Sequence, residues 1–277
     1  MGDGGSEPER KFFQFIFPVL LNMNTLLAIR NLTVQVNGTA ILDDVSLDIA
    51  VGKITAIVGG SGSGKTTLGL SILRLLPPAL QITNGQINFI QQDILALPEN
   101  DLRKLRGRDI GFIFQEPLSA LNPLFTIGRQ IDEVLGAHTD LKTKARYERV
   151  MDVLKSVEIP DPVRIYNSYP HQLSGGLRQR AMIAQAIVCH PKLIIADEPT
   201  SSLDVTVQAK IMALLRKLNK EMQITVILIS HDLGMVSHLA EEIAVLRQGK
   251  VVETGLVKNI MEHPRHSYTQ ELLEAFV

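Results

Sequence analysis

The chain has 277 residues, and its 28 Lys and Arg against 29 Asp and Glu give a net charge of −1. This balance provides no overall positive field for nucleic acid, and 45% hydrophobic residues is more than a disordered chain carries. The single cysteine excludes an intrachain disulfide and any multi-cysteine zinc or iron–sulfur site. The length allows one large domain or two modest ones.

The N-terminal segment is a poor match to a membrane span or a signal peptide. A span needs about 20 consecutive apolar residues. The apolar segment at residues 11–23 is shorter, is interrupted by Gln14 and Pro18, and is followed by no small-residue cleavage pattern. We expect residues 1–23 to form a disordered leader outside the functional domain.

The first part of the predicted domain is a layer of antiparallel strands. Residues 26–49 alternate apolar and polar side chains around Asn37-Gly38, which predicts two strands joined by a turn. An apolar run at residues 54–58 then predicts a buried strand, and residues 66–76 have the spacing of a helix.

Further buried strands are predicted at residues 110–114, 193–196, 224–229 and 243–246. Helical segments separate most of them, which indicates an α/β fold with a mostly parallel sheet covered on both faces. Residues 117–173 contain no buried strand and predict an all-helical insertion. Residues 257–277 predict a tail of short helices.

A glycine-rich loop follows the first buried strand. Residues 59–66 fit G-x-x-x-x-G-K-[ST] between a strand and a helix, which is the context of a phosphate-binding P-loop. Inward-facing backbone amides and the helix N-terminus can bind phosphate oxygens, Lys65 can reach the β- and γ-phosphates, and Thr66 can ligate Mg²⁺. The alternative interpretation is a glycine-rich turn whose lysine binds no phosphate.

Two adjacent carboxylates end the strand predicted at residues 193–196. Neighbouring side chains of a strand point in opposite directions, so Asp197 and Glu198 cannot have the same role. Asp197 suits the outer shell of a Mg²⁺ held by Thr66, and Glu198 suits a general base or water-orienting group for attack on a γ-phosphate.

A second anion-binding helix start is predicted at Ser174-Gly175-Gly176. Ser174 is a good N-cap, and the glycines expose backbone amides at the positive end of the helix dipole. One bound mononucleotide does not need both this helix start and the P-loop from the same chain. Two copies arranged head to tail would use both.

Together with Gln115, Ser201 to Asp204 and His231, these motifs resemble the nucleotide-binding subunit of ATP-binding cassette (ABC) transporters over about residues 26–256. The resemblance implies an ABC ATPase domain at residues 24–256. The motifs are residues 59–66, Gln115, residues 173–179, Asp197-Glu198, Ser201 to Asp204, and His231. The resemblance implies a P-loop NTPase core that binds ATP and Mg²⁺, hydrolyses ATP, and forms a head-to-tail dimer with the nucleotides at the interface.

The resemblance also implies roles for individual residues. Glu198, His231 and Gln115 are the expected catalytic residues, and Thr66, Gln115 and Asp197 are the expected Mg²⁺ contacts. Asp204 resembles the aspartate that helps to hold the two subunits together. The expected nucleotide contacts are Gly59, Gly60, Ser61, Gly62, Ser63, Gly64, Lys65, Thr66 and Thr67 from one subunit, and Ser174, Gly175, Gly176, Gln179 and Asp204 from the other.

One position departs from the family pattern. The family usually places an aromatic ring near the end of the first strand to stack on adenine, whereas this chain has Val36 there. Because base stacking is worth about 1–3 kcal/mol, we expect weaker affinity for adenine and weaker selectivity against guanine.

The segment 115–128 and the ending at residues 263–273 resemble the dipeptide, oligopeptide and nickel importer branch of the family. Peptide-importer subunits often carry cysteines near the C-terminus, but this chain has only Cys189, so its short form favours the nickel-importer ATPase. A dipeptide or oligopeptide importer ATPase is the alternative.

The resemblance implies a peripheral subunit at the cytoplasmic face of the inner membrane, with several partners. These are two membrane-spanning permease subunits, a second ABC ATPase (a copy or a paralogue) and, indirectly, an extracytoplasmic substrate-binding protein. A soluble ABC ATPase of DNA repair or translation and a P-loop kinase are rival interpretations. The first would predict a coiled coil, tandem cassettes or a basic face, so no nucleic-acid partner is expected, and the second leaves Ser174-Gly175-Gly176 unexplained.

Overall fold

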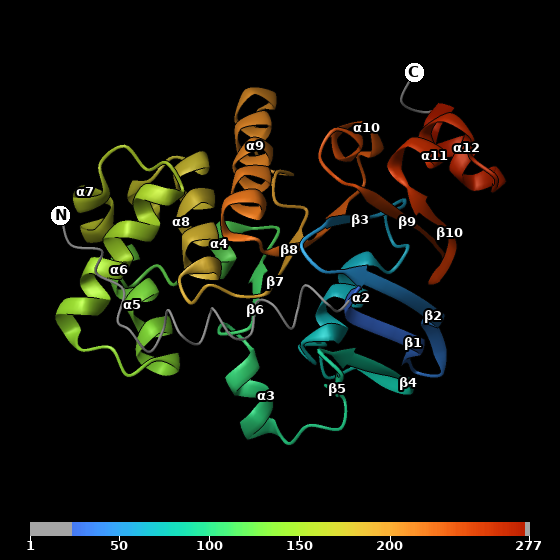
Figure 1. Cartoon of the computed structure of the whole chain (residues 1–277), viewed down its shortest axis with the longest axis horizontal. Coiled ribbons are helices and arrows are strands. Elements are labelled where there is room, and N and C mark those ends of the chain that lie inside the picture. The colour runs from blue at the N-terminus through green and yellow to red at the C-terminus, as the bar shows by residue number, and fades with distance from the viewer. Residues whose placement is uncertain (1–23, 275–277) are drawn as a thin grey trace.

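The computed structural model describes residues 24–274, so the predicted leader lies outside the described residues. The described chain forms two sheets and a group of helices (Figure 1). One sheet has four strands in the order β2-β1-β4-β5, and the other has six in the order β10-β9-β3-β8-β7-β6.

The four-stranded sheet is antiparallel and begins with the predicted hairpin. β1 (Thr25–Val36) pairs with β2 (Thr39–Ala50) across a turn at residues 37–38, which confirms that prediction. β4 (Leu80–Phe89) and the short β5 (Gln92–Asp93) extend the sheet. These two strands were not predicted from the sequence.

The six-stranded sheet is mostly parallel, as predicted. β3 (Ile54–Val58) lies between β8 (Thr225–Ser230) and β9 (Glu242–Arg247), and both pairings are parallel. β7 (Leu193–Asp197) and β6 (Ile110–Ile113) continue the parallel order beyond β8. The exception is the edge strand β10 (Lys250–Leu256), which pairs antiparallel with β9.

Alternate residues of β3 belong to the two hydrophobic cores on opposite faces of this sheet. Ile54, Ala56 and Val58 pack in the core that contains the long helices. Ile57 packs in the other core, with buried residues of the antiparallel sheet. Side chains of a strand alternate between faces, so the parallel sheet is covered on both sides, as the sequence predicts.

The helices of residues 117–172 lie together in Figure 1, beside α8. Every residue of this segment is described, and none is in a strand. Within residues 24–274 the helices are α2 (Lys65–Ile72), α3 (Glu99–Leu105), α4 (Pro117–Ala120), α5 (Ile127–His138), α6 (Thr143–Ser156), α7 (Pro162–Asn167), the 3-10 turn η1 (Pro170–Gln172), α8 (Gly175–Ile187), α9 (Val205–Met222), α10 (Leu233–Ser237), α11 (Val257–Glu262) and α12 (Ser267–Glu274).

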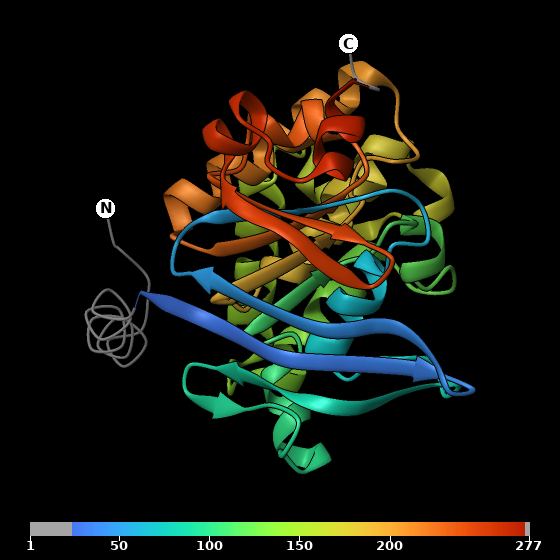
Figure 2. The same cartoon turned by 90° about the vertical axis from the view of Figure 1, so that its right-hand side faces the viewer.

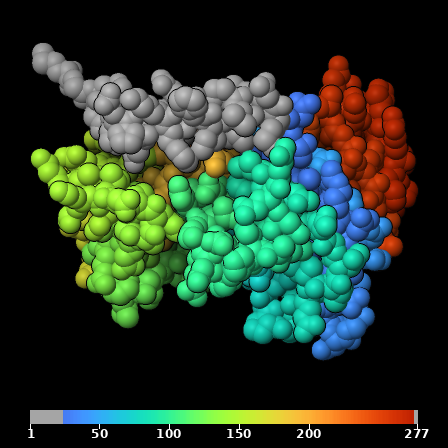
Figure 3. Space-filling model, turned by 60° about the horizontal axis from the view of Figure 1, so that its bottom comes forward, coloured from blue at the N-terminus to red at the C-terminus, as the bar shows by residue number. Residues whose placement is uncertain are grey.

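The C-terminal part of the described chain packs beside the first hairpin. Figures 2 and 3 show the red C-terminal segment next to the blue hairpin, on the side of β2. An ion pair of 3.0 Å between Lys250 Nζ and Asp43 Oδ2 joins β10 to β2. Among residues 24–274, no helix combines the length and the apolar character that crossing a membrane requires.

Candidate functional site

The P-loop is packed tightly between β3 and α2. Gly64 caps α2 with a left-handed φ of 103°, and a Cβ there would lie 2.8 Å from Leu42 Cδ2, so only glycine fits. A Cβ on Gly59 would collide with the carbonyl oxygen of Leu246 in β9. The loop is therefore held in shape by the neighbouring strands, while Ser61 and Gly62 at its tip are exposed.

Lys65 points back into the loop. Its Nζ donates to the carbonyl oxygens of Gly59 at 2.8 Å and Gly60 at 2.9 Å. Burial lowers the pKa of Lys65, and the nearby carboxylates of Glu198 and Asp197 act in the opposite direction. An ammonium held on neutral carbonyls can exchange them for phosphate oxygens, which form stronger charge-assisted hydrogen bonds.

Thr66 and Asp197 meet at the start of α2. The Thr66 hydroxyl donates to Asp197 Oδ1 at 3.1 Å, and Asp197 is only 3% exposed. Burial raises the pKa of this carboxyl group, and the Thr66 hydrogen bond lowers it in part. Hydroxyl and carboxylate oxygens are the donors that Mg²⁺ prefers, so these two residues fit a metal that takes its other ligands from phosphate and water.

Ser63 provides a further sign of an anion site. Its hydroxyl is buried within the loop and has no hydrogen-bond partner. A buried hydroxyl without a partner is costly, and phosphate oxygens entering the loop would remove that cost.

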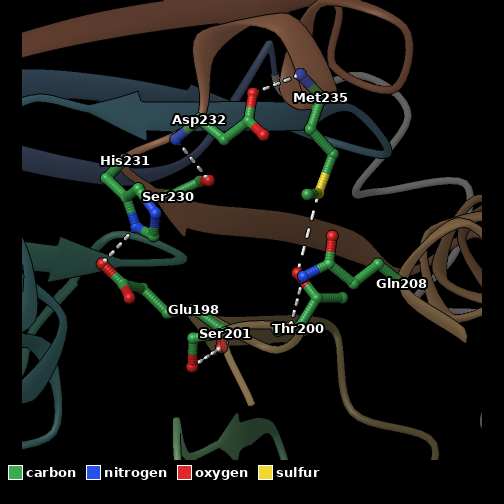
Figure 4. Close-up of a pocket in the computed structure, with 8 residues that line it drawn as sticks. All are labelled: Glu198, Thr200, Ser201, Gln208, Ser230, His231, Asp232 and Met235. Atoms are coloured by element: carbon green, nitrogen blue, oxygen red, sulfur yellow. Dashed lines mark hydrogen bonds and ion pairs between the residues drawn. The ribbon is translucent and has the colours of Figure 1, made fainter. Parts of the chain in front are cut away.

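Glu198 connects the other two predicted catalytic residues. Gln115 Nε2 donates to Glu198 Oε2 at 3.1 Å. On the other side, His231 Nδ1 lies 3.2 Å from Glu198 Oε1, as Figure 4 shows. β6, β7 and β8 are neighbours in the sheet, and the three residues follow their carboxyl ends. The structure therefore brings together Gln115, Glu198 and His231.

The backbone of Glu198 explains why it differs from Asp197. β7 ends at Asp197, and Glu198 has a left-handed φ of 43°. Its amide donates to the carbonyl of Ile229 at 3.0 Å. The chain therefore turns at Glu198, so that Asp197 faces Thr66 while Glu198 faces Gln115 and His231.

A small pocket beside Glu198 contains residues that were not predicted from the sequence. The lining residues, all drawn in Figure 4, are Glu198, Thr200, Ser201, Gln208, Ser230, His231, Asp232 and Met235. Ser230 Oγ accepts from the Asp232 amide at 3.0 Å, and Asp232 Oδ1 accepts from the Met235 amide at 2.7 Å. These bonds hold the turn that carries His231. The N-cap pattern of an Asp before an apolar helix could have revealed Asp232.

The glycine-containing start of α8 lies away from the P-loop of the same chain. Ser174 Oγ accepts from the Leu177 amide at 3.4 Å as the N-cap of α8. Cβ atoms on Gly175 and Gly176 would lie 3.2 Å from Leu203 and 3.0 Å from Val207. In Figure 1, α8 is grouped with the insertion helices, whereas α2 lies with the antiparallel sheet.

Four more residues named from the sequence lie elsewhere around the site: Asp204, Gln179, Val36 and Thr67. Asp204 Oδ1 accepts from the Val207 amide at 3.0 Å and caps α9 beside the start of α8. Gln179 is 1% exposed and its Nε2 has no hydrogen-bond partner, and its contact with a nucleotide stays a prediction. Val36 ends β1 as a half-buried aliphatic side chain, and Thr67 is half-buried in the first turn of α2.

The sequence matches the ABC transporter family over residues 42–201. It is 47% identical to the peptidoglycan transport ATP-binding protein YejF of Agrobacterium fabrum, and that alignment covers 92% of this chain and 47% of the relative. It is 44% identical to the dipeptide transport ATP-binding protein DppD of Bacillus subtilis, covering 91% of this chain and 76% of that protein. This chain therefore spans about half of the first relative and about three quarters of the second.

The fold is also that of a solved ATP-binding cassette. The dimeric post-hydrolysis structure of the cassette MJ0796, bound to ADP and Pi, superposes with a TM-score of 0.74 and 33% identity, covering 83% of this chain and 98% of that one. The family match, these relatives and the P-loop with its neighbouring carboxylates agree. The chain belongs to the ABC transporter family as an ATP-binding protein with the ABC ATPase fold.

Proposed function

We propose that this chain is the ATP-hydrolysing subunit of an importer that carries dipeptides or oligopeptides through separate membrane-spanning permease subunits. The observation that carries the ATPase role is the contact of Glu198 with both Gln115 and His231, next to Lys65, Thr66 and Asp197. Peptides are favoured over nickel because the relatives described above are named for dipeptide and peptidoglycan transport. The nickel interpretation has no support from these names.

In this proposal, the residues of the P-loop bind the substrate ATP and those around Glu198 act on the attacking water. Lys65 moves from the Gly59 and Gly60 carbonyls to the phosphate oxygens, where it stabilises the charge that develops in the transition state. Bound Mg²⁺, held by Thr66 and Asp197, supplies further charge neutralisation on the phosphates.

Glu198 has the role of proton acceptor. The water oxygen bonds to the γ-phosphorus, the bond to the bridging oxygen breaks, and ADP and phosphate leave while Glu198 takes the water's proton. Gln115 and His231 orient the Glu198 carboxylate, because each contacts a different oxygen of it. His231 is well exposed at 60%, so it can also reach a γ-phosphate at the surface.

The proposed working form contains a second ABC ATPase, either another copy or a paralogue. Ser174 and Gly175 are exposed at the start of α8 and are separated from the P-loop of their own chain. A head-to-tail partner would place this helix start on the nucleotide of the other subunit, with Gly176 and Asp204 nearby. The MJ0796 cassette, whose solved structure is dimeric and bound to ADP and Pi, supports a dimer by similarity.

The proposed permease contact is on the insertion side of the domain, around and after Gln115. Phe114, just before Gln115, is 41% exposed, and Leu118 and Leu124, after it, are 55% and 77% exposed. Exposed apolar side chains close in sequence are a feature of protein interfaces, and a short apolar segment of a permease would cover them. This contact would hold the subunit peripherally at the cytoplasmic face of the inner membrane. The segment follows Gln115, so movement of the insertion would couple nucleotide binding to transport.

Uptake measurements test the proposal. The chain is co-expressed with its permease subunits, the second ATPase and the substrate-binding protein, and uptake of a radiolabelled dipeptide and of nickel is measured separately. We expect dipeptide uptake that stops with Glu198→Gln and is unaffected by excess nickel. Nickel uptake without dipeptide uptake would overturn the cargo only, whereas an active protein found with nucleic acid and without permeases would overturn the importer role.

A further inference from the structure

The C-terminal helix contacts the P-loop. The hydroxyl of Tyr268, in the first turn of α12, accepts a hydrogen bond from the Gly60 amide at 2.8 Å. A Cβ on Gly60 would lie 3.1 Å from that hydroxyl oxygen, so the two groups are closely packed. The contact joins residues that are 208 positions apart, and Tyr268 belongs to none of the nucleotide-binding motifs.

The ring of Tyr268 is held by the β9–β10 hairpin. The guanidinium of Arg247, the last residue of β9, lies 4.6 Å from the ring centroid, which is an attractive cation–π arrangement. Two residues later, the Gly249 amide donates to the Ser63 carbonyl at 2.9 Å. The hairpin therefore contacts the P-loop directly at Gly59 and Ser63 and reaches Gly60 through Tyr268.

The start of α12 is anchored to β10. The two carboxylate oxygens of Glu253 accept from the backbone amides of Arg265 at 2.9 Å and His266 at 3.0 Å. A carboxylate at this place also interacts favourably with the positive end of a helix. These bonds position Tyr268 without any contribution from the P-loop itself.

The peptide groups at Gly60 are thus held from two directions. The Gly60 carbonyl accepts from Lys65 Nζ, and the Gly60 amide donates to Tyr268. Lys65 must release the carbonyl when it moves to phosphate. The bond from Tyr268 does not depend on Lys65, so it can hold this part of the loop in both states.

We propose that Tyr268 is a positioning residue of the ATP site, whose hydroxyl holds the Gly60 end of the P-loop in the shape that receives the phosphates. This role rests on the ATPase function proposed above. A loop that is already ordered loses less conformational freedom when ATP binds, so the hydrogen bond contributes to affinity although Tyr268 does not contact the reacting atoms.

The variant Tyr268→Phe tests this role because it removes only the hydroxyl and keeps the ring against Arg247. Loss of one hydrogen bond predicts a Kd for MgATP that rises about three- to tenfold. KM for ATP should rise similarly with kcat little changed, which indicates lost binding. Amide hydrogen exchange of the peptide containing Gly60 should become faster in the nucleotide-free protein.

The matched control is Tyr147→Phe, since Tyr147 is an exposed tyrosine on α6 whose ring contacts Tyr166. It should change neither the affinity nor the exchange. A Tyr268→Phe protein that binds MgATP like the wild type, with unchanged exchange at Gly60, overturns the positioning role. Wild-type protein that fails to bind MgATP overturns the ATP site and this role with it.

A second variant separates positioning from a general loss of structure. Glu253→Gln weakens the anchor of α12 but keeps the Tyr268 hydroxyl, so a smaller rise in Kd is expected. Combined with Tyr268→Phe, it should cause no further rise, because both act through the same hydrogen bond. Fully additive effects would overturn the proposed path from β10 through Tyr268 to Gly60.

Discussion

Replacing Glu198 by glutamine should stop ATP hydrolysis while leaving ATP binding intact. The carboxylate accepts hydrogen bonds at both oxygens, from Gln115 and from the ring of His231 when Nδ1 carries a proton. Glutamine has nearly the same shape but only one accepting oxygen, so one of these two donors loses its partner. It also cannot take a proton from water at neutral pH.

The size of the effect follows from the loss of a general base. A general base typically raises a reaction rate about 10²- to 10⁴-fold, which corresponds to lowering the activation free energy by about 2.7–5.4 kcal/mol. ATP binding should change little, because the Lys65 contacts with the loop and the Thr66–Asp197 hydrogen bond do not involve Glu198. Because ATP still binds but is not hydrolysed, the head-to-tail dimer with ATP at its interface should accumulate.

Phosphate release, the Kd for MgATP and the molar mass in solution with ATP are the three measurements. Glu133→Gln is the matched control, since Glu133 is an exposed residue that is ion-paired with Arg129 on α5. The control should hydrolyse ATP at the wild-type rate. A Glu198→Gln protein that releases phosphate at more than about one tenth of the wild-type rate would refute the role of Glu198 as the base.

Three other substitutions test the binding half of the site. Lys65→Ala removes charge-assisted hydrogen bonds worth about 1.5–3 kcal/mol, so equilibrium binding should show a Kd for MgATP raised at least tenfold, and an unchanged Kd would contradict the phosphate role. Burial raises the pKa of Asp197, so the charged carboxylate destabilises the folded protein above that pKa. Asp197→Asn should therefore raise the melting temperature of the nucleotide-free protein at pH 7.5, while Mg²⁺-dependent turnover falls. The gain in melting temperature should shrink as the pH falls through the raised pKa of Asp197 and be absent below about pH 4, the ordinary pKa of an unfolded-state aspartate. A lower melting temperature at pH 7.5 would count against this reasoning. Val36→Tyr should lower the Kd for ATP about fivefold or more by stacking on adenine, and equal binding of ATP by both proteins would show that adenine does not lie there.

The local pattern of apolar and polar residues was sufficient to predict most of the fold. The hairpin at residues 25–50 and the buried strands of the parallel sheet alternate or concentrate apolar residues in ways that neighbouring residues alone determine. β4 and β10 were not predicted because few of their side chains are fully buried, and the polar residues among them leave no regular spacing of apolar residues. Such strands depend on pairing with distant strands more than on their own pattern.

The residues of the candidate site also differ in how far local sequence alone could predict them. The P-loop and the start of α8 were predictable because contiguous backbone amides and a helix N-terminus make an anion site within a few residues. Gln179 is a different case: the family resemblance implied its nucleotide contact, and the structure buries its side chain, as it buries those of Ser63 and Lys65. A helix places successive residues on different faces, and only packing shows which face is covered.

The sequence by itself determined the type of chemistry, because phosphate binding needs glycines, a lysine and a hydroxyl at fixed local spacing. The tertiary structure decided how distant residues combine. Strand order brings Gln115 and His231 to opposite oxygens of Glu198, and a turn with positive φ separates Glu198 from Asp197. Only the packed fold places Tyr268 against Gly60, since a hydrogen bond across 208 positions leaves no periodic signal in the chain.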